Sequence, residues 1–304
     1  MGSTAPVVVV ANPTAGRGKA GKRIGAADTI LRNLRVDHEV RVAGSAAELE
    51  STCREVAEGG AEIVAVIGGD GTVSCAVNGL LGTGAALAVL PAGTGDDLAS
   101  AIGARTFPAA VRLLANPKTE AVDVVRVRAG DAVRCFVNIA GAGFDSEVNE
   151  AADAMTARLG GTGTYVAALL KTLPRFTPAR YDLLIDDEPL TVDAMLVVVG
   201  NGRSYGGGMK VLPDASIVDG VMDVCVVEAL STWAFLRAFP TVYAGRHTTH
   251  PKVRMFRATS VSIEANRGIQ VYADGERVGP LPARFDVMPG ALPVVVGPGA
   301  KGVR

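Results

Sequence analysis

Residues 61–72 read Ala-Glu-Ile-Val-Ala-Val-Ile-Gly-Gly-Asp-Gly-Thr. The first seven residues predict a buried β-strand, because a short apolar run rich in β-branched side chains suits the interior of a sheet. The paired glycines at its end allow backbone N–H groups to close on an anion. Asp70 would repel a bare phosphate, but it fits if it holds a Mg²⁺ ion that bridges to the phosphates. A tight turn with a capping aspartate is the alternative for this loop alone.

A second loop repeats this logic. A strand predicted over 85–90 is followed by Pro91-Ala92-Gly93-Thr94-Gly95-Asp96-Asp97, which offers glycines, a hydroxyl and two carboxylates at the start of a helix. Further strands are predicted over 6–11 and 36–42, with helices between the strands and a capping box at Ser45 and Glu48. Both acidic loops therefore follow strands and precede helices, and that edge of an open α/β sheet is where ligands bind.

The pattern changes after about residue 120, where alternating strands and tight turns predominate. Strand pairs flanking turns are predicted at 122–128 with 132–140, 181–185 with 192–199, and 260–264 with 269–272, and two helices interrupt them at 164–173 and 232–244. We therefore expect a parallel α/β nucleotide-binding domain over 1–127, to which the last residues from about 290 to 304 could return. A mainly antiparallel β-sandwich domain is expected over 128–289, with the active site in the cleft between the two.

Composition limits the classes of protein and partner. The 304 residues carry a formal net charge of -1, so no overall field attracts nucleic acid or an anionic bilayer, and any membrane contact must come from a local patch. The apolar runs are far below the ~20 residues that a membrane span needs. The N-terminus lacks the pattern of a signal peptide, and the four cysteines lie far apart, as expected for small buried side chains in a reducing compartment. These features predict a cytoplasmic location.

One glycine-rich stretch is a false lead. Residues 16–21 match the dinucleotide fingerprint G-x-G-x-x-G after a strand, but four residues separate the strand from the first glycine, and the second strand ends without an acidic residue. The same stretch nearly forms a P-loop, but Arg23 stands where a Mg²⁺-binding Ser or Thr is needed. Basic residues at the start of a helix still suit a phosphate.

An ordered series of motifs resembles the diacylglycerol kinase catalytic-domain family, which includes bacterial diacylglycerol kinases, sphingosine kinases and ceramide kinases. The series spans nearly the whole chain and comprises Asn12-Pro13-Thr14-Ala15-Gly16, Gly68-Gly69-Asp70-Gly71-Thr72, 91–97, 141–145, 205–208, 213–215, 219–223 and Asp274-Gly275-Glu276. A single Gly-Gly-Asp-Gly also occurs in NAD kinases and phosphofructokinases, whereas the full series is specific.

The resemblance implies a role for each matching position. ATP would lie along three loops, formed by Asn12, Pro13, Thr14, Ala15 and Gly16, by Gly68, Gly69, Asp70, Gly71, Thr72, Val73 and Ser74, and by Gly93, Thr94 and Asp97. Asp70 and Asp97 would organise the catalytic Mg²⁺ and the phosphates. Asp274 and Glu276 would carry the base that takes the proton from the lipid hydroxyl, with Glu276 preferred. A structural Mg²⁺ would be bound by Asp219 and by carbonyl oxygens of Ser216 and Val221.

The same resemblance implies an ATP-dependent lipid kinase of phospholipid biosynthesis that touches the inner membrane surface, with diacylglycerol the favoured acceptor. Asp96 stands where the family often has Asn, and Ser74 replaces another frequent Asn. The acceptor pocket has no short motif, so a sphingosine-like base, phosphatidylglycerol or a glycolipid remains an alternative. A kinase for a soluble acceptor and a non-catalytic lipid- or nucleotide-binding regulator remain open, as does a homodimer. The apolar stretches 165–170 and 233–239 could contact lipid, but we prefer to interpret them as core-facing parts of helices.

Overall fold

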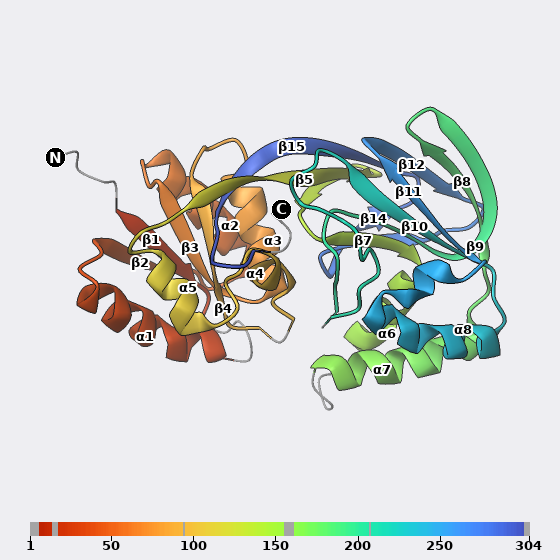
Figure 1. Cartoon of the computed structure of the whole chain (residues 1–304), viewed down its shortest axis with the longest axis horizontal. Helices are drawn as coiled ribbons and strands as arrows, with labels where there is room; N and C mark the ends of the chain where they lie inside the picture. Colours follow the sequence, from red (N-terminus) through yellow and green to blue (C-terminus); the bar gives the residue numbers. More distant parts are fainter. Residues whose placement is uncertain (1–5, 14–17, 94, 155–160, 207, 301–304) are drawn as a thin grey trace. The chain divides into compact units, whose positions relative to one another are not determined.

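The computed structural model describes residues 6–13, 18–93, 95–154, 161–206 and 208–300. The chain divides into two compact units (Figure 1). Unit 1 comprises Met1–Val124, Ile217–Asp219 and Pro289–Arg304, and unit 2 comprises Val125–Ser216 and Gly220–Met288. Strands β5 (Thr119–Ala129) and β15 (Ala283–Val295) each begin in one unit and end in the other.

Unit 1 is built on a parallel sheet with the strand order β2-β1-β3-β4, to which the end of β15 adds in parallel at Val294 and Leu87. Helices α1 and α5 pack together, as do α2 and α3, and the two pairs lie on opposite faces of the sheet (Figure 1). The elements are β1 (Val7–Ala11), α1 (Lys19–Asn33), β2 (His38–Val42), α2 (Ala46–Glu58), β3 (Ile63–Gly68), α3 (Asp70–Leu80), β4 (Ala86–Pro91), α4 (Asp97–Ala101) and α5 (Phe107–Leu113).

The sequence explains this layering. Strands β1 and β4 are buried throughout, and β3 is buried from its second residue onward, as expected for strands covered by helices on both faces. Helix α2 begins as predicted, because the Ser45 hydroxyl accepts the Glu48 N–H at 3.1 Å and the Glu48 carboxylate accepts the Gly44 N–H at 2.7 Å.

Unit 2 is mainly antiparallel, as expected. Its strands run in the order β14-β13-β7-β9-β8-β12-β15, and β10 pairs with both β9 and β11. The elements are β6 (Ala132–Phe136), β7 (Ile139–Gly143), α6 (Phe144–Ala154), α7 (Gly161–Thr172), η1 (Leu173–Arg175), β8 (Ala179–Ile185), β9 (Glu188–Gly200), β10 (Met222–Glu228), α8 (Thr232–Ala238), η2 (Phe239–Ala244), η3 (Arg246–Thr249), β11 (Val253–Ala258), β12 (Ser260–Ala265), β13 (Gln270–Ala273) and β14 (Glu276–Pro280).

Two hydrophobic cores hold unit 2 together. One lies among the strands and contains Phe136, Tyr181 and Phe285. The other lies between strands and helices and contains Phe144 and Phe235 with buried residues of α7, β9 and β10. Alternate residues of β8 are buried, which is the period of a strand with one covered face.

Three features of unit 2 differ from the expectation. Helix α6 was not predicted; it begins at Phe144, directly after strand β7 with its glycines Gly141 and Gly143. The helix expected over 232–244 ends at Ala238 and continues as the 3₁₀ helix η2, since Pro240 cannot donate to an α-helical hydrogen bond. The strands on either side of residues 266–268 do not pair with each other, because β12 pairs with β8 and β15 whereas β13 pairs with β7 and β14.

None of the four cysteines, all of which lie within the described residues, forms a disulfide; Cys53, Cys75 and Cys225 are buried and Cys135 is half-buried. Burial raises the pKa of the Cys225 thiol to about 12, so this thiol stays protonated and unreactive. Within the described residues, no helix combines the length and the apolar character that crossing a bilayer requires.

Candidate active site

The three predicted nucleotide loops of unit 1 begin at one edge of its parallel sheet. Ala11 pairs with Ile67, and Gly68 pairs with Pro91, so the carboxyl ends of β1, β3 and β4 are in register. The Ala92 N–H donates to the Gly68 carbonyl at 2.8 Å and extends this register into the loop. The half-buried Asn12 and Pro13 follow β1 at the same edge. Thr14, Ala15, Gly16 and Thr94 lie outside the described residues.

Glycine is required where the second and third loops meet. A Cβ atom on Gly93 would lie 2.7 Å from the Gly69 Cα and 2.7 Å from the Asp96 Oδ1, both closer than real Cβ contacts come. A Cβ on Gly68 would collide with the Thr72 side chain. The two backbones therefore approach each other only because these positions lack side chains.

The Asp70 carboxylate joins these loops. Its Oδ1 accepts the Asp97 N–H at 2.9 Å, and its Oδ2 accepts the Asp96 N–H at 3.1 Å. Asp96 has the left-handed conformation with φ 52°, and its own carboxylate accepts the Gly93 N–H at 3.0 Å. Asp70 thus fixes the start of α4 from the start of α3, across the edge of the sheet.

Two carboxylates converge beside Gly95. A Cβ on this glycine would lie 2.5 Å from the Asp70 Oδ2 and 3.4 Å from the Asp97 Oδ2. Within the described residues, no group of three or more His, Cys, Asp or Glu side chains could hold a metal ion. Two carboxylates nevertheless suit Mg²⁺, which usually takes one or two carboxylates and completes its shell with water and phosphate oxygens. The residues present therefore fit this ion.

The remaining predicted residues of the second loop belong to helix α3. Gly71, Thr72, Val73 and Ser74 form its first turns, and Val73 and Ser74 are both 3% exposed. The N-cap residue, Gly69, has no side chain that could accept a hydrogen bond from the first backbone N–H groups of the helix. The backbone N–H groups of this first turn are therefore the ones able to meet an anion, whereas Val73 and Ser74 face the interior.

Sequence reasoning gave Arg23 no role at the site, but the structure brings it to this edge. Its guanidinium donates to the Pro91 carbonyl at the end of β4 and lies 5.0 Å from the centroid of the Phe107 ring. Arg23 attracted attention only because it broke the P-loop pattern. Its position next to Lys22 in the first turns of a helix was the signal that could have identified it as a residue of the site.

In unit 2, Asp274 has a structural task. It occupies the turn between β13 and β14 with φ 47°, and its Oδ1 accepts the N–H groups of Asn138 at 3.2 Å and Ile139 at 3.0 Å. Its Oδ2 accepts the Val137 N–H at 3.2 Å. Three backbone donors therefore hold this carboxylate against the start of β7.

Glu276 differs from Asp274 although it lies only two residues away. It begins β14, it is exposed, and its side chain makes no hydrogen bond or ion pair within the described residues. A carboxylate with free oxygens can accept a proton from a substrate hydroxyl, whereas one engaged by three backbone donors is better suited to fix a turn. The structure separates the two acids that the sequence left equivalent.

Two other motifs of unit 2 meet through a side-chain hydrogen bond. The Tyr205 hydroxyl donates to the Asp145 carboxylate at 2.8 Å, which joins the segment 205–208 to the segment 141–145. Asp145 is 4% exposed, and a Cβ on Gly141 would lie 2.6 Å from its Oδ2. Gly207 of this series lies outside the described residues.

The predicted structural metal site stays a prediction. Asp219 is exposed in a turn with Gly220 at φ 75°. Ile217–Asp219 belongs to unit 1, where the Asp123 N–H donates to the Ile217 carbonyl at 2.7 Å. Ser216 and Val221 belong to unit 2.

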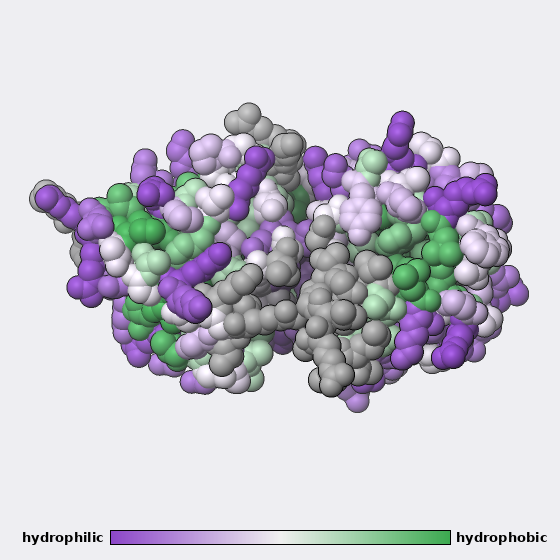
Figure 2. Space-filling view, turned by 90° about the horizontal axis from the view of Figure 1, so that it is seen from below, coloured by the Kyte–Doolittle hydropathy of each residue, from purple (hydrophilic) through white to green (hydrophobic). Residues whose placement is uncertain are grey.

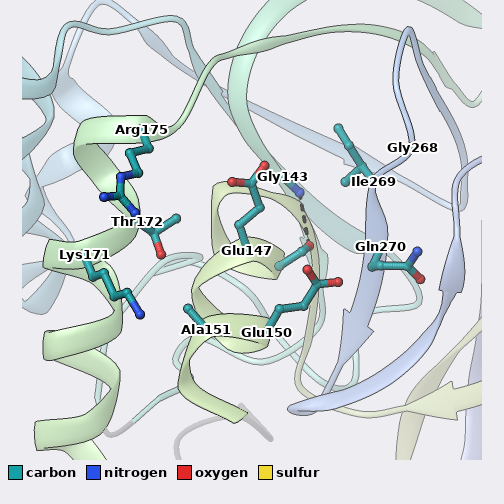
Figure 3. Close-up of a pocket in the computed structure, with 11 residues that line it drawn as sticks. Gly143, Glu147, Glu150, Ala151, Lys171, Thr172, Arg175, Gly268, Ile269 and Gln270 are labelled. Carbon is teal, nitrogen blue, oxygen red and sulfur yellow. Dashed lines mark hydrogen bonds between the residues drawn. The ribbon is translucent and has the colours of Figure 1, made fainter. Parts of the chain in front are cut away.

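Unit 2 contains a polar pocket of about 610 Å³ between α6, α7 and the segment 268–270 (Figure 3). Glu147 and Glu150 of α6, Lys171 of α7 and Arg175 of η1 line it, so charges of both signs face the same space. Glu147 also pairs with Arg267 at 2.9 Å. No predicted catalytic residue lines this pocket.

A smaller apolar pocket of about 80 Å³ lies among α7, α8, η2 and the strands of unit 2. Phe144, Phe235 and Phe239 line it, and the buried His247 reaches it. Burial lowers the pKa of His247, although its Nε2 lies 3.0 Å from the Val211 carbonyl, a contact that favours the charged form.

Comparisons with known proteins match both halves of the chain. A model described as the diacylglycerol kinase catalytic domain matches residues 6–127, and one described as the YegS C-terminal NAD kinase beta sandwich-like domain matches residues 138–296. A diacylglycerol kinase of Mycobacterium tuberculosis is 36% identical over 95% of this chain and 94% of its own length. A diacylglycerol kinase of Bacillus subtilis is 26% identical over 91% of each chain, and a probable lipid kinase YegS-like of Stenotrophomonas maltophilia is 29% identical over 86% of this chain and 87% of its own.

Solved structures share the fold. The crystal structure of a diacylglycerol kinase from Bacillus anthracis superimposes with a TM-score of 0.76 at 22% identity and covers 99% of this chain and 100% of its own. A second structure from that organism gives a TM-score of 0.81 at 24% identity, covering 98% of this chain and 100% of its own. The parallel unit and the antiparallel sandwich are therefore a known combination.

Proposed function

The chain belongs to the diacylglycerol kinase family, and from this premise we propose that it transfers the γ-phosphoryl group of ATP to a hydroxyl of diacylglycerol, giving phosphatidic acid. The coarser assignment, a lipid kinase, rests on relatives that carry this name across almost the entire chain. The observation that carries the proposal is the pair of loops joined by Asp70, with a second carboxylate from Asp97 beside it.

Unit 1 would hold the nucleotide. The first turn of α3 offers backbone N–H groups to the phosphates, and the lack of side chains at Gly69 and Gly93 lets the two loops approach each other there. Asp97 would face a Mg²⁺ ion, while Asp70 would keep Asp97 in place through its backbone N–H. Bound Mg²⁺ would neutralise charge on the phosphates. These residues bind and orient; they do not react.

Unit 2 would supply the base. A lipid alcohol is a poor nucleophile at neutral pH, so a carboxylate that accepts its proton as the new P–O bond forms speeds the reaction. Glu276 is exposed, and its side chain makes no hydrogen bond or ion pair within the described part of the chain, which suits this role. Asp274 would hold the turn that presents Glu276. The proposed mechanism thus draws on residues of both units.

Product analysis on a mixed lipid panel tests the proposal. The purified protein is supplied with labelled ATP, Mg²⁺ and micelles that contain diacylglycerol, a sphingosine-like base, phosphatidylglycerol and a glycolipid. We expect label in phosphatidic acid, and we expect its loss in Asp97→Ala. Label in another lipid would show that diacylglycerol is not the acceptor, and label in a soluble acceptor such as NAD would show a different class of kinase. Tight ATP binding without label transfer would indicate a non-catalytic regulator. The same preparation, tested by sedimentation, shows whether the chain forms a homodimer.

A further inference from the structure

Helix α8 and the 3₁₀ helices after it carry aromatic side chains that unit 2 leaves uncovered. Trp233, the one tryptophan of the chain, is 82% exposed, and Tyr243 is 42% exposed. Burying a large aromatic ring is strongly favourable, so an exposed tryptophan on a short helix calls for an explanation. Scattered exposed apolar residues are normal; two aromatic rings on one short helical segment are a patch.

The opposite side of the same segment anchors it to the core. Phe235 is 7% exposed, and its ring lies 5.0 Å from that of Phe144 and 5.9 Å from that of Phe239. Phe239 in turn contacts the Tyr243 ring at 6.2 Å. The helix is therefore held by Phe235 and Phe239, and Trp233 is not needed for this packing.

The charge of this segment has one sign. Residues 229–263 contain no aspartate or glutamate, although the whole chain has a net charge of -1, and they contain Arg237, Arg246, Lys252, Arg254 and Arg257. The acid that precedes the segment, Glu228, is paired with Lys252 at 3.0 Å.

Two of these cations form no ion pair within the described residues, in contrast to Lys252. Arg237 and Arg246 are exposed, and in the part of the chain that the structure describes their side chains make no ion pair or hydrogen bond. By contrast, Lys171 of α7 and Arg175 of η1 share their pocket with Glu147 and Glu150. The uncompensated positive charge therefore lies on α8 and η3.

Surface shape agrees with this reading. A hollow of about 480 Å³ opens beside Trp233 and is lined also by Arg237 and His250. Viewed from below, hydrophobic side chains gather over the part of unit 2 that carries α7 and α8, with hydrophilic side chains around them (Figure 2). Aromatic rings next to arginines are the composition of segments that lie in the headgroup region of a bilayer.

We propose that Trp233, Arg237, Tyr243 and Arg246, called here the docking face, bind the surface of an anionic bilayer. The two rings enter the headgroup region, and the arginines meet lipid phosphates. The proposal rests on the proposed function, because an enzyme whose acceptor stays in a membrane must reach that surface. It assigns the contact to α8, η2 and η3, which contain none of the proposed catalytic acids.

Fluorescence of the lone tryptophan tests the docking face directly. The full-length protein is mixed with vesicles of phosphatidylglycerol and phosphatidylcholine, or of phosphatidylcholine alone, without ATP. With the anionic vesicles we expect a blue shift of Trp233 emission and protection from acrylamide, both weakened by high salt. Binding to these vesicles with unchanged emission would overturn the proposal, since Trp233 would then lie outside the contact.

Substitutions supply the second measurement, co-sedimentation with the same vesicles. Arg237→Gln and Arg246→Gln should each lower the partition coefficient about fivefold, and Trp233→Ala about tenfold. Arg180→Gln and Leu184→Ala on β8 are matched controls, because they remove an exposed charge and an exposed apolar side chain elsewhere in unit 2. Equal losses in the β8 variants and the docking-face variants would refute the assignment, as would a dimer that dissociates on Trp233→Ala without any change in vesicle binding.

A soluble substrate separates this proposal from the proposed function. Trp233→Ala should phosphorylate a short-chain diacylglycerol dissolved as monomers at the wild-type rate, while losing activity on vesicles. If the wild-type protein phosphorylates neither, the proposed function fails while vesicle binding still tests the docking face. If Trp233→Ala retains full activity on vesicles, the docking face fails and the kinase stands.

Discussion

Replacing Asp274 by asparagine should separate the role of this residue from that of Glu276. Asparagine tolerates the left-handed conformation that Asp274 adopts at φ 47°, so the backbone is not strained by the change. An amide has one oxygen, whereas the carboxylate uses Oδ1 for two backbone N–H groups and Oδ2 for the N–H of Val137. The best orientation of the amide keeps the first pair and turns an NH₂ group toward Val137.

The magnitude follows from this count. Losing one hydrogen bond to a charged group and weakening two others costs about 2–3 kcal/mol in the free energy of unfolding. For a unit of this size that is a fall of roughly 4–12 °C in Tm. Glu276→Gln removes no hydrogen bond or ion pair within the described residues and should leave Tm within about 1–2 °C, while kcat falls about 10²–10⁴-fold.

Asp186 provides a matched control. It also has a left-handed conformation, with φ 50°, and it accepts the N–H groups of Thr259 and Ser260 at 3.0 and 2.9 Å. Burial raises the pKa of Asp186, but these hydrogen bonds outweigh burial and hold it below its usual value. The Thr259 and Ser260 donors all meet Oδ1 of Asp186, so the amide oxygen of Asp186→Asn can still accept from them. This change should therefore lower Tm less than Asp274→Asn does and leave kcat unchanged.

Calorimetry and initial rates on the three variants decide the matter. If Asp274→Asn abolishes turnover while its Tm stays at the wild-type value, Asp274 is the base and the separation argued here is wrong. Wild-type kcat in Glu276→Gln would be equally decisive against Glu276.

Three further predictions concern unit 1 and the buried histidine. Gly93→Ala should weaken ATP binding and lower the free energy of unfolding by about 1–3 kcal/mol, because a Cβ at this position has no room. Gly25→Ala, in open space on α1, should be neutral or stabilising. Titration with ATP and thermal melts measure both effects, and equal behaviour of the two variants would contradict the prediction. Burial holds the pKa of His247 below 6.5. As the pH falls below about 6.5, this histidine is therefore protonated in the unfolded chain before it is protonated in the folded chain, and the folded state loses stability. Tm should then drop more between about pH 7.5 and 5.5 in the wild type than in His247→Gln, and parallel curves would exclude this histidine. Arg23→Gln should cost about 1–2 kcal/mol through the lost contact with the Pro91 carbonyl, and an unchanged Tm would contradict that contact.

The parallel unit was predictable because its strands are short apolar runs that end in glycine-rich loops. Residues 61–72 alone indicate a strand, an anion loop and a helix start, and the register of β1, β3 and β4 follows once the sheet is parallel. The acids at the sheet edge could be named in advance for the same reason. The sequence could not predict which of these acids accepts backbone hydrogen bonds. The hydrogen bond from the Asp97 N–H to the Asp70 carboxylate depends on how the two loops meet in space.

Unit 2 was harder to predict in detail. Alternation predicts an antiparallel domain, but it does not say which strands pair, and β12 and β13 are neighbours in sequence without pairing with each other. Helix α6 begins at Phe144, within a motif whose glycines Gly141 and Gly143 belong to strand β7, and no helix was predicted there. The local sequence pattern does not show that Ile217–Asp219 belongs to unit 1, because this membership depends on contacts such as the hydrogen bond between Asp123 and Ile217.

The central claim is that Asp97 of unit 1 and Glu276 of unit 2 serve one phosphoryl transfer to a lipid hydroxyl. The most direct test is kcat for diacylglycerol in Asp97→Asn, in Glu276→Gln and in the double variant, with ATP as donor. Groups that act together give losses that do not multiply, so the double variant should be about as slow as the slower single one. Independent, multiplying losses, or wild-type turnover in either single variant, would contradict the account.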